Sequence, residues 1–293
     1  MSCLLMLPAL PADRHSLAGT RVEIVHEKTP RGRVRVALFD FDGTLSLIRE
    51  GWPEVMIPLM VEHLAQTPRA EPRDQLRQRV EEFVMRLNGK QTIYQMIQLA
   101  EEIRARGGEP LDPIAYKHEY HEQLLQRIHG RTRGLRDGTL STESLTVPGS
   151  LELLQALADL GLELHLASGT DLMYVKQELE ALQLHTFFGG RVYGAIDDYR
   201  NFSKKMVIEK LVAELQLGPG ELLGFGDGFV EIQEVSRVGG IAVGVASDET
   251  HRVGINDWKR HRLIEAGADL IVPDYRDLAP LLDHLALGPA RGA

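Results

Sequence analysis

Two kinds of hydrophobic pattern alternate along the chain. Residues 33–39 form a short, mostly apolar run of β-branched and large side chains, which is typical of a strand buried on both faces of a sheet. From residue 149 onward, amphipathic helical segments alternate with similar runs near 162–167, 191–195, 221–225, 240–245 and 269–272. Repeated strand–helix units of this kind predict a parallel sheet with helices on both faces.

The stretch from 53 to 145 has a helical period instead. Apolar residues recur three and four positions apart, as in Met56, Met60 and Leu64. Turn residues interrupt the pattern near 67–68, 88–89 and 107–113. We therefore expect four helices with almost no strand, followed by a polar return linker over 134–148.

These patterns predict an α/β protein, with a three-layer, Rossmann-like parallel sheet as its core and an inserted all-α subdomain. We expect an N-terminal extension over 1–32, an α/β core over 33–48 and 146–287, and a helical cap over 49–145. Within the extension, the alternation in residues 21–26 predicts a short edge strand.

Composition limits the kinds of molecule that the chain is expected to bind. The chain is 43% hydrophobic and 26% charged, with a net charge of −9 and no block of Lys and Arg, so nucleic acid is not expected as a partner. No apolar run approaches the roughly 18 residues of a membrane span, so no membrane association is expected. Cys3 is the only cysteine, which excludes a disulfide framework and favours a cytoplasmic location. No pattern predicts an oligomeric state.

Polar residues follow three of the expected strands. Asp40 and Asp42 come directly after the first strand, and side chains two apart on a strand point the same way. Ser168 follows a later strand, and Asp227 follows another, with Glu231 four residues further on. Open α/β sheets bind ligands at the carboxyl ends of their strands, so we expect these side chains to share one cleft. The alternative for the aspartate pair alone is a solvated turn.

The residue types suit metal and phosphate together. Carboxylates with water make an oxygen-only site of the kind that Mg²⁺ prefers. A hydroxyl at Ser168, the backbone N–H of Gly169 near a helix start and a lysine suit a phosphate dianion. We prefer Lys204 to Lys205 as that lysine, because Ile208 and Leu211 then anchor the helix with Lys204 facing the site. Such a cleft points to phosphoryl transfer.

Two neighbours of Ser168 have structural interpretations. Thr170 is an alternative helix N-cap, and Asp171 is expected to interact with the helix dipole rather than to act in catalysis. In the inserted subdomain, His118 and His121 are three residues apart rather than the four of a zinc-binding helix, so we expect an ordinary helix face.

The ordered motifs resemble those of the haloacid dehalogenase-like hydrolase superfamily. The similarity covers about residues 33–285, and the helical insert after the first motif is similar to the cap of its phosphatases. The motifs that carry it are Asp40-Phe41-Asp42-Gly43-Thr44, Ser168, Lys204 and Gly226-Asp227-Gly228-Phe229-Val230-Glu231.

The resemblance implies a role for each motif residue. Asp40 would be the nucleophile that forms an aspartyl-phosphate, and Asp42 would protonate the leaving group and then activate water. Mg²⁺ would be held by Asp40, the backbone carbonyl of Asp42 and Asp227. Glu231 stands where many members have aspartate, and its longer side chain would reach the metal directly or through water. Ser168 and Lys204 would bind the phosphoryl group.

The sequence thus predicts a Mg²⁺-dependent phosphatase of a small phosphorylated metabolite, such as a sugar phosphate or a phosphoglycolate-like monoester. Alternatives are a phosphomutase and a non-catalytic protein that binds a phosphorylated ligand. A dehalogenase is disfavoured, because carbon–halogen hydrolysis needs no acid like Asp42 and no metal carboxylates. Arg49 and Trp52, at the entry to the predicted cap, and Lys90, in a turn between its helices, are candidate substrate contacts, although a structural role suits each equally well.

Overall fold

The computed structural model describes residues 15–26, 30–196 and 199–287; Cys3 and the first part of the predicted extension lie outside these ranges. Within them, one sheet has the strand order β1-β7-β6-β5-β2-β3-β4. The strands are β1 (Glu23–Ile24), β2 (Val36–Phe39), β3 (Glu163–Asp171), β4 (Val192–Ala195), β5 (Leu222–Gly226), β6 (Ile241–Val245) and β7 (Leu270–Val272). Every neighbouring pair is parallel except β1 and β7. The predicted α/β class is confirmed.

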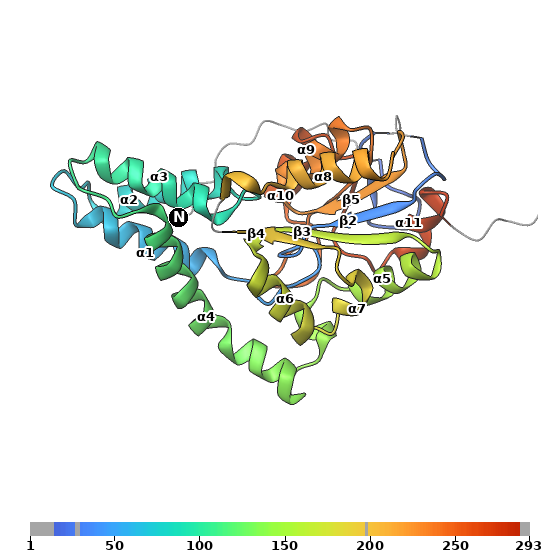
Figure 1. Cartoon of the computed structure of the whole chain (residues 1–293), viewed down its shortest axis with the longest axis horizontal. Coiled ribbons are helices and arrows are strands. Elements are labelled where there is room, and N and C mark those ends of the chain that lie inside the picture. Colours follow the sequence, from blue (N-terminus) through green and yellow to red (C-terminus); the bar gives the residue numbers. More distant parts are fainter. Residues whose placement is uncertain (1–14, 27–29, 197–198, 288–293) are drawn as a thin grey trace, which may run out of the picture.

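Helices cover both faces of the sheet (Figure 1). One face carries α5 (Ser150–Asp159), α6 (Leu172–Ala181), α7 (His185–Phe188) and α11 (Leu278–His284). The other carries α8 (Lys204–Glu214), α9 (Phe229–Arg237) and α10 (Asp257–Glu265). All four residues of β2 are buried, because this central strand is covered on both sides.

The inserted segment folds as the four predicted helices, which lie to one side of the sheet in Figure 1. They are α1 (Pro53–Ala65), α2 (Arg73–Arg86), α3 (Thr92–Ala105) and α4 (Pro113–Asp137), and are called the helical insertion below. No helix among the described residues is long and apolar enough to cross a bilayer.

One local prediction was wrong, and three short helices were not predicted. The return linker does not begin at residue 134, because α4 continues to Asp137 and ends at Gly138 with φ +77°. The short helices α7, η1 (Thr142–Leu145) and η2 (Tyr199–Asn201) were missed. Three or four residues are too few to give a helical hydrophobic period.

The predicted edge strand over 21–26 is confirmed as β1. Its Glu23 forms a buried ion pair with Arg260 of α10, and nearby Arg21 binds Asp274 at 2.6 Å. These pairs join the residues before β2 to the far edge of the sheet.

Gly149, at the start of α5, packs too closely for any side chain. Its φ is +84°, and a Cβ there would lie 2.7 Å from the carbonyl carbon of Tyr275. Gly161, just after the same helix, has φ +77° with no heavy atom within 4 Å. We expect Gly149→Ala to lower the free energy of unfolding by about 3–4 kcal/mol. The matched Gly161→Ala should cost only about 1–2 kcal/mol, the cost of a left-handed alanine.

Urea unfolding followed by circular dichroism measures both changes. Equal losses in the two variants would show that the contact with Tyr275 is unimportant.

Candidate active site

The sheet order brings the polar strand ends together. β2 lies between β3 and β5, with Phe39 opposite both Leu166 and Phe225. Asp40 follows β2 and Asp227 follows β5. The sequence suggested that Ser168 follows a strand, but it lies within the irregular last part of β3. The three side chains therefore meet at the carboxyl end of β2, where the order of the strands reverses. Open α/β sheets usually bind their ligands at this point.

A cavity of about 90 Å³ lies between this edge of the sheet and the helical insertion. The core contributes Asp40, Asp42, Ser168, Gly169, Lys204 and Asp227. The insertion and its entry contribute Arg49, Trp52, Met56, Lys90, Gln95 and Tyr120. Of the predicted site residues, Glu231 alone does not line the cavity.

Lys204 is the first residue of α8 and joins two carboxylates. Its Nζ lies 2.6 Å from Asp40 Oδ2 and 2.9 Å from Glu231 Oε2, with all three side chains buried. Although burial lowers the pKa of Lys204, the two carboxylates raise it above its ordinary value, so the amine stays charged. Ser203 caps the helix by accepting the N–H of Met206, and Lys205 points to solvent.

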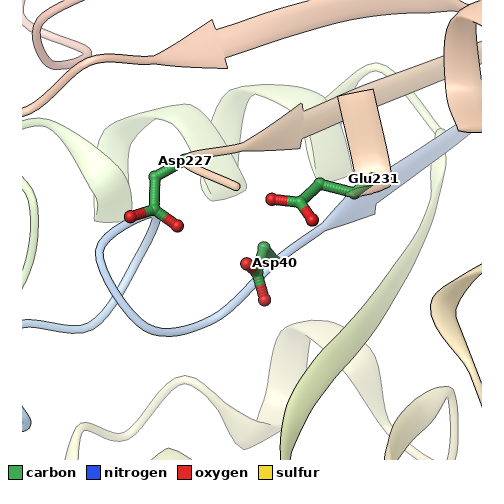
Figure 2. Close-up of side chains that lie close together, drawn as sticks. All are labelled: Asp40, Asp227 and Glu231. Atoms are coloured by element: carbon green, nitrogen blue, oxygen red, sulfur yellow. The ribbon is translucent and has the colours of Figure 1, made fainter. Parts of the chain in front are cut away.

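Asp40, Asp227 and Glu231 form a group with the spacing of a metal site. One oxygen from each lies within 4.8 Å of the others, and Figure 2 shows the three carboxylates around a common space. Burial raises the pKa of Asp40 well above its usual range; Lys204 offsets this in part, and Glu231 and Asp227 raise it again. Burial also raises the pKa of Asp227. An all-oxygen group in which the carboxylates outnumber the ammonium groups beside them fits a hard divalent cation such as Mg²⁺.

Glu231 already has two partners in this group. Besides Lys204, it accepts the backbone N–H of Gly228, the N-cap residue of α9, at 2.6 Å. The carboxylate is therefore oriented by the helix that carries it. Glu231 contacts Lys204 but does not line the cavity. This position suits a direct or a water-mediated metal contact.

Asp42 sits in a different environment from Asp40. Its Oδ2 accepts a hydrogen bond from Thr170 Oγ1 at 2.9 Å, and its buried Oδ1 has no hydrogen-bond partner. Arg49 Nε lies 3.7 Å from Oδ1 but is bound mainly by Glu178. Burial raises the pKa of Asp42 to about 6; Arg49 offsets this effect and Glu178 adds to it. A carboxyl group with this pKa can both donate and accept a proton near neutral pH.

Ser168 and Thr170 are linked through the backbone. Ser168 Oγ accepts the N–H of Thr170 at 3.0 Å, and both side chains are buried at the cavity. The proposed N-cap role of Thr170 was wrong, because Asp171 occupies that position of α6. Asp171 pairs with Lys117 of α4 at 2.5 Å, which joins the core to the insertion.

The three candidate substrate contacts all line the cavity but differ in their surroundings. Arg49 is held by Glu178, with the closest contact at 2.7 Å. Trp52 precedes α1 and packs partly against the core. The ammonium of Lys90 lies 5.8 Å from the ring centre of Tyr94. Lys90 is the most exposed of the three and belongs to the turn between α2 and α3.

That turn rests directly on the α/β core. A Cβ on Gly169 would lie 3.0 Å from the carbonyl oxygen of Lys90, and one on Gly228 would lie 2.9 Å from the Cα of Gly89. Gln91 Nε2 donates to the carbonyl of Phe202 at 2.6 Å, and Arg262 of α10 donates to the carbonyl of Met85. The insertion therefore covers the cleft in this structure.

Sequence reasoning missed two charged residues beside Asp227. Lys259 Nζ lies 2.8 Å from Asp227 Oδ2 and 2.6 Å from Glu249 Oε1. A local signal existed, because Asn256 caps α10 and places Lys259 in its first turn, much as Ser203 precedes Lys204. Glu178, Thr170 and Tyr120 were likewise not proposed as site residues.

His118 and His121 of α4 do not belong to the metal-like group found among the described residues. His121 is buried; burial and the nearby cations Arg49 and Lys117 lower its pKa to about 3. The neighbouring Glu119 pairs with His63 at 2.8 Å. This segment is a packed helix face, as its spacing predicted.

Comparison with protein families gives one match. The sequence model described as "Hydrolase: haloacid dehalogenase-like hydrolase" matches residues 34–239. A search of curated proteins found no match.

Several solved structures share the fold. A HAD hydrolase of family IA, variant 3, from Entamoeba histolytica has 18% identity and a TM-score of 0.57, with 86% of this chain and 99% of that chain covered. A predicted phosphoglycolate phosphatase from Haemophilus somnus has 17% identity and a TM-score of 0.56, covering 85% and 98%. A putative beta-phosphoglucomutase from Thermotoga maritima has 20% identity and a TM-score of 0.52, covering 85% and 99%.

Proposed function

Because the chain belongs to the haloacid dehalogenase-like hydrolase family, we propose that it is a Mg²⁺-dependent phosphatase that acts through an aspartyl-phosphate on Asp40. The observation that carries the proposal is the placement of two aspartates with different surroundings on one cavity. Asp40 lies among Lys204, Asp227 and Glu231, where the contact with Lys204 and a bound cation would together favour its ionised form. Asp42 lies apart from them, with a raised pKa of about 6 that suits proton transfer.

The first step forms a bond between a carboxylate oxygen of Asp40 and phosphorus, and breaks the bond from phosphorus to the ester oxygen. Asp42 gives its proton to the departing oxygen. Ser168 Oγ, the Gly169 N–H and Lys204 hold the phosphoryl oxygens. When bound, Mg²⁺ supplies positive charge that offsets the repulsion between the phosphate and the carboxylates.

In the second step, water attacks phosphorus and gives its proton to the Asp42 carboxylate. The bond from phosphorus to Asp40 breaks, so the Asp40 carboxylate is restored and inorganic phosphate is released. Thr170 positions Asp42 through its hydrogen bond. The helical insertion limits the access of bulk water and shapes the space for the leaving group.

We propose that the substrate is a small phosphorylated metabolite, because the cavity of about 90 Å³ is covered by the insertion and excludes a folded protein. Arg49, Trp52 and Lys90 are the proposed contacts to the leaving group. A phosphomutase would use the same two aspartates and is the alternative. Product analysis separates the two, because a mutase returns an isomeric phosphate ester instead of inorganic phosphate.

Removal of divalent metal is expected to lower the rate of ester hydrolysis at least ~10²-fold, because the buried carboxylates then repel the substrate phosphate. The measurement is phosphate release from a panel of metabolite phosphates after treatment with EDTA, and again after Mg²⁺ is restored. The proposal fails if no ester in a broad panel is hydrolysed with Mg²⁺ present.

A further inference from the structure

A second buried lysine contacts one carboxylate of the candidate metal site. Lys259 is 6% exposed, and its Nζ contacts Asp227 at 2.8 Å and Glu249 at 2.6 Å. Ser247 Oγ lies 3.4 Å from the same nitrogen and itself donates to the carbonyl of Gly43 at 2.9 Å. Lys259 does not line the cavity, so any effect on the reaction must pass through Asp227 or Glu249.

The two buried lysines divide four carboxylates between them. Lys204 contacts Asp40 and Glu231, whereas Lys259 contacts Asp227 and Glu249. With every group ionised, four negative and two positive charges leave a formal charge of −2. One divalent cation neutralises this charge, which is a reason for the site to take a single such ion.

The Asp227 carboxylate has two oxygens, and Lys259 contacts Oδ2. The second oxygen can then accept a cation. The ammonium fixes the rotation of the carboxylate and at the same time repels any cation bound to it. Glu249 lines the cavity but lies outside the group of three carboxylates with metal-like spacing, so its charge acts on a cation from further away.

We propose that Lys259 is a positioning residue that orients Asp227 and sets the cation affinity of the site through its charge, with Glu249 as the opposing charge. The inference rests on the proposed function, because it assumes that Asp227 binds the metal. It predicts shifts of opposite sign from two residues, neither of which is proposed as a metal ligand.

The test is the dissociation constant for Mg²⁺ at pH 8, measured by isothermal titration calorimetry on the full chain without substrate. Lys259→Met removes a positive charge near the ion, so we expect binding at least tenfold tighter than in the wild type. Glu249→Gln removes a negative charge and should weaken binding at least threefold. Lys259→Arg keeps the charge and should stay within about threefold of the wild type, and the double variant Lys259→Met with Glu249→Gln should lie between the single variants.

The thermal midpoint gives a second readout. Lys259→Met leaves two partly buried carboxylates without their cation, so its apo form should melt lower and gain more from saturating Mg²⁺ than the wild type does. If that variant does not fold, Glu249→Gln and the double variant still carry the test, because restored charge balance should return the affinity toward that of the wild type.

Unchanged or weaker binding in a folded Lys259→Met variant, or unchanged binding in Glu249→Gln, overturns the inference. Those results would leave the phosphatase proposal intact, because the wild type would still bind Mg²⁺. If the wild type itself binds no Mg²⁺, the metal dependence of the proposed function fails together with the inference.

Discussion

Replacing Asp40 with asparagine is expected to abolish phosphatase activity, with a loss of at least ~10⁴-fold in kcat. The amide is isosteric with the carboxylate but has no anionic oxygen to attack phosphorus. The substitution also removes the negative charge that Lys204 Nζ contacts at 2.6 Å. Initial rates of p-nitrophenyl phosphate hydrolysis with saturating Mg²⁺ measure the loss.

A matched control tests whether any buried aspartate has this effect. Asp274 is 3% exposed and pairs with Arg21 and Arg276, yet it does not line the cavity. Asp274→Asn should therefore destabilise the protein while the folded fraction keeps its kcat. If Asp40→Asn keeps more than a tenth of the wild-type rate, Asp40 is not the nucleophile.

Asp42→Asn is expected to lower kcat about 10³-fold, which is the usual contribution of a general acid and base. The effect on kcat/KM should depend on the substrate. An alkyl phosphate needs the proton from Asp42, whereas p-nitrophenolate is a stable leaving group that departs without it. Parallel measurements on the two esters therefore separate the acid role of Asp42 from its role as base.

The same group predicts a pH dependence. Because burial raises the pKa of Asp42 to about 6, its protonated fraction falls as pH rises above 6. For an alkyl ester, kcat/KM should then fall about tenfold per pH unit well above that pKa, and Asp42→Asn should lack this limb. Thr170→Val removes a hydrogen bond that lowers the pKa of Asp42, so it should move the limb to higher pH. A limb that persists in Asp42→Asn would belong to another group.

Much of the fold and part of the site could be predicted because their signals are local. The apolar run of β2 ends directly at Asp40, and the rule for parallel sheets then places Asp227 and Ser168 beside it. The four helices of the insertion followed from an apolar period that extends over several turns. The three-residue helix η2 has no such period and was missed.

The missed residues depend on contacts between distant segments. Lys259 reaches Asp227 only because α10 packs beside α9, and no periodic pattern marks that contact. Arg49 is held by Glu178, which is 129 residues away. Hydrophobic period predicted the helices of the insertion but not which of their side chains, such as Tyr120, would face the cleft.

The most direct test of the account is to trap the phosphorylated enzyme. In Asp42→Asn, p-nitrophenyl phosphate with Mg²⁺ should phosphorylate Asp40, and the missing base should slow hydrolysis of the intermediate. The account predicts a burst of about one p-nitrophenolate per enzyme. It also predicts that borohydride reduction of the quenched protein converts residue 40 to homoserine, as read by peptide mass spectrometry. No burst and no modified peptide, or modification at a residue other than Asp40, would contradict it.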